Sequence, residues 1–360
     1  MQITYFPYLG LKAFDEIDFG EFKLWNFQAK AEEYIKDEQV REHINKILLS
    51  NLSHNQPIEG ICIFSTGNDD FRDLALEEIY LVDEARLILF LAFISKVNVS
   101  AMGANAGHFM ATSENFTYII QNFVVGNDYI SERSGYIVSK AVGGYKIGEI
   151  KFQAPSYLLT PLKFSTDGQL VSQLLKLRKN QKRFYRTILR ATDLLFQSYF
   201  NDPYVSIYSR ILLQASALEV LLNLPDRDQR KVLKEKVEKY LVQPDDKVRT
   251  FLSERGTGNK VKEKASIKVM WADKFYTLRN HIIHGNLVKL EEFYFYRQRH
   301  IEIFLMFFIL FVKEIINEKM KKKLFIDRIK VGEFEYDTEK FTGFIYKDNS
   351  LILRLNRLKK

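Results

Sequence analysis

The hydrophobic and polar positions of the first 165 residues change their period several times, which predicts a domain of mixed strands and helices. Residues 14–27 alternate over short stretches and predict an extended segment. Residues 58–66 form a short apolar run that is typical of a buried strand. Apolar residues recur at helical spacing over 29–52 and 81–97, so we expect a helix in each of these ranges.

Further strands are expected at residues 116–125 and 136–142. Gly143 and Gly144 follow the second of them. Two adjacent glycines supply the positive φ values of a tight hairpin turn, so residues 145–152 are expected to fold back as a partner strand.

Beyond residue 165 the pattern becomes helical. The helices that we expect there span residues 168–200, 202–223, 225–242, 267–284 and 291–320. Residues 253–264 are polar, contain two glycines and predict a loop. The sequence thus predicts an α+β fold, with a mixed α/β domain over 1–165, a helical bundle over 166–322 and a short β-rich tail over 323–360 that is a candidate to complete the N-terminal sheet.

The composition narrows the class of protein. One cysteine, Cys62, lies in an apolar run and is expected to be a small buried side chain, so a disulfide framework and a multi-cysteine zinc site are excluded. The first residues lack the features of a signal peptide, and the longest apolar run, residues 303–312, is well short of the roughly 20 residues of a membrane span. We expect a cytoplasmic protein without a membrane partner.

The net charge of +8 permits a polyanionic partner, and its distribution is informative. Residues 176–190 contain seven basic residues and no acidic one. Four of the basic residues are spaced by four, three and four positions and would form one stripe on a single helix: Lys179, Arg183, Arg186 and Arg190. This stripe is either a track for a nucleic-acid backbone or a solvated helix face.

The candidate chemistry lies in residues 278–285, whose sequence is Leu-Arg-Asn-His-Ile-Ile-His-Gly. Arg279 can hold a phosphate through two parallel N–H donors, and the imidazole of His284 can give or take a proton. Asn280 is four positions before His284 and would share its helix face, where it could orient His284 or a phosphate. Gly285 fits the left-handed position that ends a helix. These groups could cut a phosphodiester without a metal.

Other interpretations of these residues are structural. Arg279 could pair with a carboxylate, and His284 could cap helix carbonyls. His281 with His284 could form half of a metal site, although no nearby cysteine or aspartate other than Asp273 would complete it. His300 lies on an apolar helix and is expected to be a packed or capping histidine.

A loop of small residues, 102–108, could bind a ligand but lacks the lysine and the spacing of a P-loop. It lies in the N-terminal domain, for which a ligand or trigger of unknown kind is possible.

The pattern R-N-x-x-x-H-G resembles the signature of the HEPN superfamily, an all-helical group rich in ribonucleases of conflict and defence systems. Residues 211–223 resemble the S-A-L-E-x-L-L helix of its ApeA-like branch, and residues 275–278 resemble the aromatic segment before the arginine. The resemblance covers residues 170–320, and the N-terminal half resembles no named family. It implies a twofold dimer that brings two motifs into one cleft.

These observations predict a metal-independent endoribonuclease of HEPN type, acting in defence or as a toxin, that cuts RNA by attack of the 2′-hydroxyl. The expected catalytic residues are Arg279, His284 and Asn280, with Glu219 on the preceding helix pairing with Arg279 and aiming it. No cofactor or metal is expected, and the partners are RNA and a second copy bound through the helical domain. The alternative is a non-catalytic sensor, adaptor or nucleic-acid-binding protein of the same type.

Overall fold

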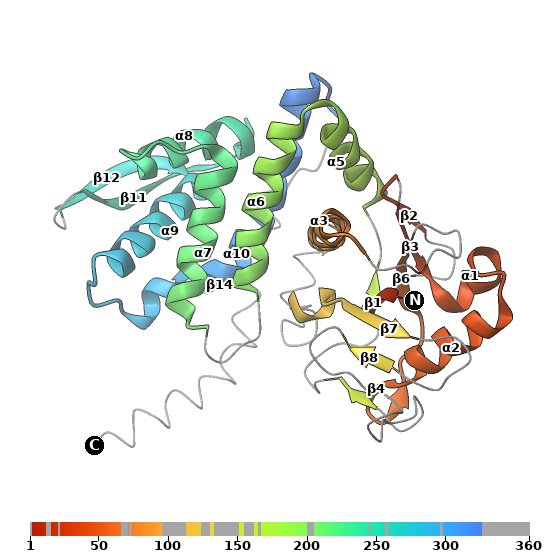
Figure 1. Cartoon of the computed structure of the whole chain (residues 1–360). Coiled ribbons are helices and arrows are strands. Elements are labelled where there is room, and N and C mark those ends of the chain that lie inside the picture. The colour runs from red at the N-terminus through yellow and green to blue at the C-terminus, as the bar shows by residue number, and fades with distance from the viewer. Residues whose placement is uncertain are drawn as a thin grey trace, which may run out of the picture. The chain divides into compact units, whose positions relative to one another are not determined.

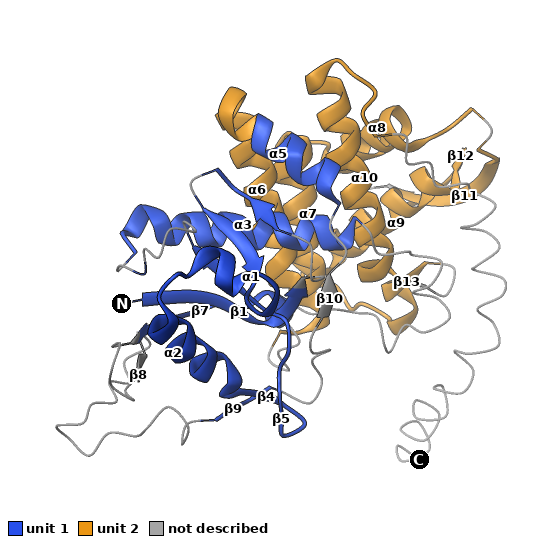
Figure 2. Cartoon of the chain, turned by 90° about the vertical axis from the view of Figure 1, so that its right-hand side faces the viewer, with its two compact units in different colours: residues 1–96, 111–176 blue, residues 97–110, 177–360 orange. Residues whose placement is uncertain are grey.

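The computed structural model describes most of the chain as two compact units (Figure 2). One unit comprises residues 1–96 and 111–176, and the other comprises residues 97–110 and 177–360. The fold class is α+β, as predicted. The described residues are 2–11, 16–20, 22–65, 71, 74–95, 113–123, 130–132, 151–154, 162–164, 167–199, 205–244, 246–255, 259–295 and 298–325.

The first unit is built on a twisted sheet around its first strand (Figure 1). Its strands are β1 (Gln2–Leu11), β2 (Ile17–Asp18), β3 (Lys23–Asn26), β6 (Ile61–Ser65), β7 (Ile119–Phe123), β8 (Ile130–Glu132) and β10 (Leu162–Phe164). Their order is β2-β3-β6-β1-β7-β8, and β10 pairs in parallel with the end of β1. Strand β1 is antiparallel to both β6 and β7.

Helices α1 (Phe27–Tyr34) and α2 (Glu38–Leu49) pack their apolar side chains on this sheet. Trp25 is fully buried there, and its indole N–H donates to Ser65 Oγ across the β3–β6 pair at 2.9 Å. The other elements of the unit are α3 (Leu76–Ile94), the short 3-10 turn η1 (Ser113–Phe116) and a small sheet of β4 (Asn51–Ser53), β5 (Gln56–Pro57) and β9 (Phe152–Gln153).

Several expectations for this unit need correction. The helix predicted over 29–52 is two helices, because the Asp37 carboxylate accepts from the backbone N–H groups of Gln39 and Val40 and starts a new one. The helix expected from residue 81 begins earlier, at Leu76. Cys62 is buried as predicted, with its thiol donating to the Leu9 carbonyl.

Three predicted features of the N-terminal half lie outside the described residues. They are the small-residue loop 102–108, the strand 136–142 and the Gly143-Gly144 turn.

The second unit is mainly helical (Figure 1). Its helices are α6 (Lys182–Ser198), α7 (Ile207–Leu222), α8 (Gln229–Leu241), α9 (Ile267–Ile283) and α10 (His300–Met320), and α5 (Gly168–Asn180) crosses from one unit into the other. Two hairpins accompany them, β11 (Val248–Arg255) with β12 (Asn259–Ser266) and β13 (Tyr294–Phe295) with β14 (Gln298–Arg299), and the 3-10 turn η4 (Leu290–Phe293) precedes β13.

Aromatic packing fixes α9 against α10. Trp271 has no exposed surface and stacks on Phe307 with ring centroids 4.2 Å apart, and Phe275 lies against Phe304 at 5.3 Å. Burial of such rings is a large apolar contribution to the stability of the bundle. The polar positions of α9 that carry the candidate chemistry are therefore held on a rigid element.

Three expectations for this unit were wrong. The helix predicted over 168–200 is interrupted at Gln181, which leaves helical geometry at φ −141° and ψ 56°. The loop predicted over 253–264 is largely the β11–β12 hairpin. The last helix starts at His300 rather than 291, because η4 and the β13–β14 hairpin come first.

The predicted tail lies outside the described residues from position 326 onward, as does the expected start of a helix at 202–203. The expected boundary at residues 165 and 166 is eleven residues before the division between the two units, which falls inside α5. Within the described residues, none of the helices has the length and apolarity needed to cross a bilayer.

Candidate active site at the end of α9

Helix α9 ends in a Schellman motif that fixes the last residues of the candidate motif. Gly285 adopts φ +67°, and its N–H donates to the Ile282 carbonyl, while the Asn286 N–H reaches back to the His281 carbonyl at 2.9 Å. The prediction that Gly285 ends the helix in the left-handed region is confirmed. His284 is the C-cap residue of α9.

Arg279 is held by the acidic side chain of Glu219 on α7, a pairing that the sequence predicted. Its Nη2 lies 2.9 Å from Glu219 Oε1 on α7, and both side chains are about four-fifths buried. Its Nη1 donates to Asn280 Oδ1 at 3.1 Å. The guanidinium therefore has a fixed orientation at the end of the bundle.

Tyr276 completes the support of Arg279 from one turn earlier on α9. The guanidinium carbon lies 5.1 Å from the centre of the tyrosine ring, and the tyrosine hydroxyl donates to Glu219 Oε1 at 2.6 Å. Gln229 on α8 also lies within hydrogen-bond distance of this hydroxyl. Burial, and next the hydrogen bond to Glu219, raise the pKa of Tyr276 well above its usual value, so the hydroxyl remains a donor.

His284 is exposed, and its imidazole has no hydrogen-bond or ion-pair partner among the described residues. The side chain of His284 does not cap the helix carbonyls, because the backbone N–H groups of His284, Gly285 and Asn286 bind them. Arg279 and His284 leave α9 about 140° apart around its axis, since five residues rotate the chain by 500°. Asn280 shares the face of His284.

His281, the other histidine of the motif, is held between two carboxylates. Its Nδ1 lies 2.8 Å from Glu292 of η4, and its Nε2 lies 3.2 Å from Glu254 of β11. Burial lowers the pKa of His281, but the hydrogen bonds to Glu292 and Glu254 outweigh it, and the pKa lies above its ordinary value. We call this three-residue contact the His281 clamp.

A metal site from His281 and His284 finds no support in this geometry. Among the described residues, no group of three or more histidine, cysteine, aspartate or glutamate side chains is arranged to hold a metal ion. Asp273, the aspartate considered as a third ligand, is fully buried and accepts from Ser253 Oγ, with Lys234 Nζ 3.5 Å away.

Of the two alternatives expected for His300, packed or capping, the structure shows a packed histidine. It is 1% exposed and lies among the rings of Trp271, Phe275 and Phe295. Burial alone lowers the pKa of His300 to about 3, so its imidazole is neutral at physiological pH.

The basic stripe is divided between two helices. Arg183, Arg186 and Arg190 lie on one exposed face of α6, whereas Lys179 belongs to α5, on the other side of the break at Gln181. All four side chains are exposed, and none of them has an ion-pair partner within the described part of the chain. The prediction of one continuous stripe on a single helix was therefore wrong: three of the residues lie on α6 and the fourth on α5.

Sequence reasoning missed the supporting residues of the site. Tyr276 is three positions before Arg279 and therefore faces the same side of the helix, a spacing that could have identified it. Gln229, Glu254 and Glu292 carried no such signal, because they come from other elements and meet α9 only in the folded chain.

Comparison of the chain with protein-family models, with curated proteins and with solved structures gives no match.

Proposed function

We propose that this protein is a metal-independent endoribonuclease of HEPN type with Arg279 and His284 as its catalytic residues. The observation that carries the proposal is the end of α9, where an oriented arginine and a solvent-exposed histidine with no described partner lie on one rigid helix. A buried network orients Arg279, while His284 is accessible to a substrate.

The chemistry needs few groups because RNA supplies its own nucleophile. The 2′-hydroxyl attacks the adjacent phosphorus, and His284 takes the hydroxyl proton as general base or protonates the departing 5′-oxygen as general acid. The bond to the 5′-oxygen breaks, leaving a 2′,3′-cyclic phosphate. Arg279 stabilises the negative charge on the pentacovalent phosphate, and Asn280 orients His284 or the scissile phosphate. DNA lacks the 2′-hydroxyl and resists cleavage.

A second copy of the chain supplies what one motif lacks. One histidine serves one of the two proton transfers, and Arg279 and His284 project about 140° apart on α9. A twofold dimer through the helical unit would place two motifs in one cleft, and twofold packing is the commonest oligomeric arrangement. The dimer is part of the proposal.

The basic residues of α5 and α6 would attract the RNA backbone. Lys179, Arg183, Arg186 and Arg190 are exposed without described carboxylate partners, so a phosphate chain would relieve their mutual repulsion. Replacing Arg183 and Arg186 by Gln should weaken RNA binding alike for all sequences and flatten its dependence on salt by roughly 0.7 units per contact. An unchanged slope in a filter-binding titration would identify a solvated face.

The decisive experiment measures RNA cleavage by the purified full-length chain and by Arg279→Ala and His284→Ala. Loss of a general acid–base group should lower the rate by about 10²–10⁴-fold, and loss of the arginine by about 10²–10³-fold. Products should carry 2′,3′-cyclic phosphate, and EDTA should leave the rate unchanged. Arg227→Ala and Lys231→Ala, exposed basic residues elsewhere on this unit, serve as matched controls.

Cleavage at the wild-type rate by both Arg279→Ala and His284→Ala would contradict the assignment. Loss of activity on chelation, with recovery on adding Mg²⁺ or Mn²⁺, would contradict the mechanism.

The second candidate function is a non-catalytic sensor or adaptor, and one observation favours it. The charge of Arg279 is already neutralised by Glu219, as in a structural ion pair. In that case the wild type would bind RNA or a protein partner without cutting RNA, and Arg279→Ala would mainly lower the stability of the helical unit.

A further inference from the structure

One face of the β11–β12 hairpin, opposite the face whose buried Phe251 and Ser253 side chains pack toward α9, is both basic and apolar. Cross-strand pairing places Thr250, Leu252 and Glu254 opposite Lys264, Lys262 and Lys260, so these six side chains share one face of the hairpin. The three lysines are exposed, and none has an ion-pair partner among the described residues. They repeat every second residue, about 6.8 Å apart.

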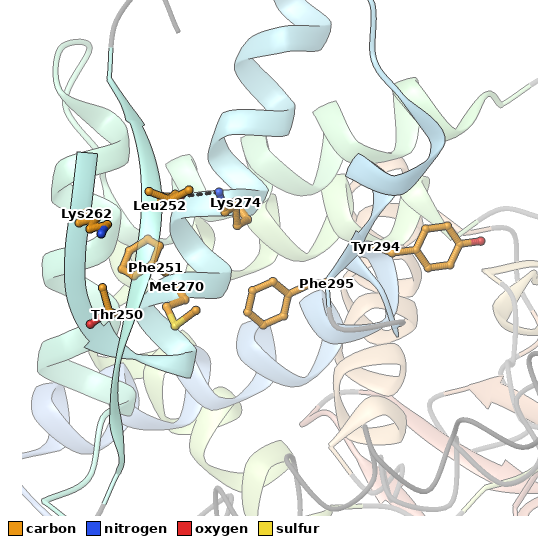
Figure 3. Close-up of a pocket in the computed structure, with 8 residues that line it drawn as sticks. All are labelled: Thr250, Phe251, Leu252, Lys262, Met270, Lys274, Tyr294 and Phe295. Carbon is orange, nitrogen blue, oxygen red and sulfur yellow. Dashed lines mark hydrogen bonds between the residues drawn. The ribbon is translucent and has the colours of Figure 1, made fainter. Parts of the chain in front are cut away.

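Next to this row is a hollow of about 560 Å³, which is the size of a small-molecule site. Its lining residues come from the hairpin, from α9 and from β13 (Figure 3): Thr250, Phe251, Leu252, Lys262, Met270, Lys274, Tyr294 and Phe295. Phe251, Met270 and Phe295 are nearly buried, whereas Leu252 and Tyr294 are 47% and 37% exposed. The hollow thus has an apolar floor and a partly exposed apolar rim.

Lys274 stabilises this arrangement by donating from Nζ to the Leu252 carbonyl at 2.7 Å (Figure 3). The carboxylates nearby are already engaged, since Glu254 and Glu292 face His281, and Glu263 pairs with Lys234. The row of Lys260, Lys262 and Lys264 therefore carries a net positive charge. We call the lysine row and the hollow together the hairpin groove.

The hairpin groove leads toward the candidate active site. Met270, Lys274 and His281 lie within about 40° of one another around the axis of α9. His284 lies about 60° from His281 around the same axis. Lys274 and His281 are two helical turns apart, about 10 Å. The Glu254 end of the groove is joined to α9 through the His281 clamp. A chain lying along the lysines would reach the helix end that carries His284.

We propose that the hairpin groove binds a single-stranded nucleic acid, with phosphates along Lys260, Lys262 and Lys264 and one unstacked base in the hollow. Charge complementarity identifies the occupant as a polyanion, and an apolar hollow with aromatic residues suits the face of a base. The inference rests on the proposed function, because it identifies the groove as the place where the RNA substrate is held. The groove contacts phosphates and a base face, which DNA shares, so it should bind both polymers.

The test measures binding separately from cleavage. A fluorescent 2′-O-methyl oligonucleotide, which cannot be cut, is titrated with the full-length chain while anisotropy is recorded at several salt concentrations. The Lys260→Gln/Lys262→Gln variant should bind more weakly, with a salt slope flatter by about 1.4 units for two single-strand contacts. Lys322→Gln/Lys323→Gln, the same charge change at exposed positions after α10, is the matched control.

A second pair of variants isolates the hollow. Leu252→Glu places a negative charge at its rim and should weaken binding roughly tenfold, the size expected for one lost base contact. Val248→Glu adds the same charge to the same face of β11, at a residue that does not line the hollow, and should have a smaller effect. With an oligonucleotide that carries abasic sites throughout, the difference between these two variants should disappear.

Four results would overturn the proposal: absence of binding by the wild type, an unchanged salt slope in the lysine variant, equal effects of Leu252→Glu and Val248→Glu, or equally tight binding of poly-glutamate, which would indicate an acidic protein partner. Failure of the proposed function looks different. In that case binding would follow the pattern expected here, while the wild type would leave ordinary RNA intact.

Discussion

The guanidinium of Arg279 carries five N–H donors, and the contacts with Glu219 and Asn280 use two of them. The three others have no acceptor among the described residues. Glu219 therefore orients the arginine without saturating it, and a phosphate could be held by the remaining donors. The same carboxylate reduces the net charge that an approaching phosphate meets, so Glu219 affects substrate binding and catalysis in opposite directions.

Glu219→Gln should separate these two effects. The amide keeps the shape of the side chain and an oxygen for the Tyr276 hydroxyl, but it removes the negative charge beside Arg279. We expect KM for RNA to fall, because the arginine is no longer neutralised, and kcat to fall roughly tenfold, because the arginine is aimed less accurately. Steady-state cleavage of a labelled RNA measures both constants.

Tyr276→Phe is the matched control for this prediction, since it removes a hydrogen bond to Glu219 and leaves the charge in place. Its KM should stay close to that of the wild type. A rise in kcat on replacing Glu219 would show that the carboxylate restrains Arg279 instead of aiming it.

At the scale of elements, the His281 clamp joins the end of β11, the turn η4 and the last turn of α9. The pKa of His281 is raised by these contacts, so the folded state stabilises the protonated imidazole. The stabilisation is complete below the ordinary histidine value of 6.5 and is lost as the pH rises through the raised pKa of the folded state. The clamp should therefore weaken from neutral toward alkaline pH.

This expectation can be measured by urea unfolding of the wild type and of His281→Gln between pH 5.5 and 9. The difference in the free energy of unfolding should be largest at the acidic end and should shrink as the pH rises. In Glu254→Gln, which removes one of the two carboxylates, the imidazole should titrate at a lower pH by NMR than in the wild type. A stability difference that does not vary with pH would contradict the charged form of the clamp.

The elements that the sequence predicted well are those with local signals at their ends. Helix α9 was expected over 267–284 and spans Ile267–Ile283, because Ser266 accepts from the Val269 N–H at its start and Gly285 ends it. The ion pair of Glu219 with Arg279 followed from the expected packing of neighbouring helices.

The elements that the sequence did not predict lack such signals. Strand β12 has only Val261 and Ala265 as apolar residues, so its alternation of hydrophobic and polar residues is weak, and the backbone pairing with β11 defines it. The break at Gln181 contains neither proline nor glycine. The His281 clamp joins residues 254, 281 and 292, which meet only through tertiary structure.

At the scale of the whole molecule, the proposed chemistry belongs to one unit. Glu219, Arg279 and His284, together with the hairpin groove, all lie in residues 177–360, while the sheet of the first unit has its own core. The first unit contributes no described side chain to the site. The number of chains needed to form one active site is thus a question about the residues of the second unit.

Mixing wild-type chains with an inactive variant distinguishes a composite site from independent sites. If both motifs of a dimer are needed, equal amounts of wild type and Arg279→Ala/His284→Ala, allowed to exchange, should retain about one quarter of the wild-type activity, because random pairing leaves that fraction of dimers intact. Independent sites should retain about one half. Sedimentation at the assay concentration provides the control, since the quarter is expected only where the chain sediments as a dimer. A monomer that cuts RNA would refute the composite site while leaving Arg279 and His284 as catalytic residues.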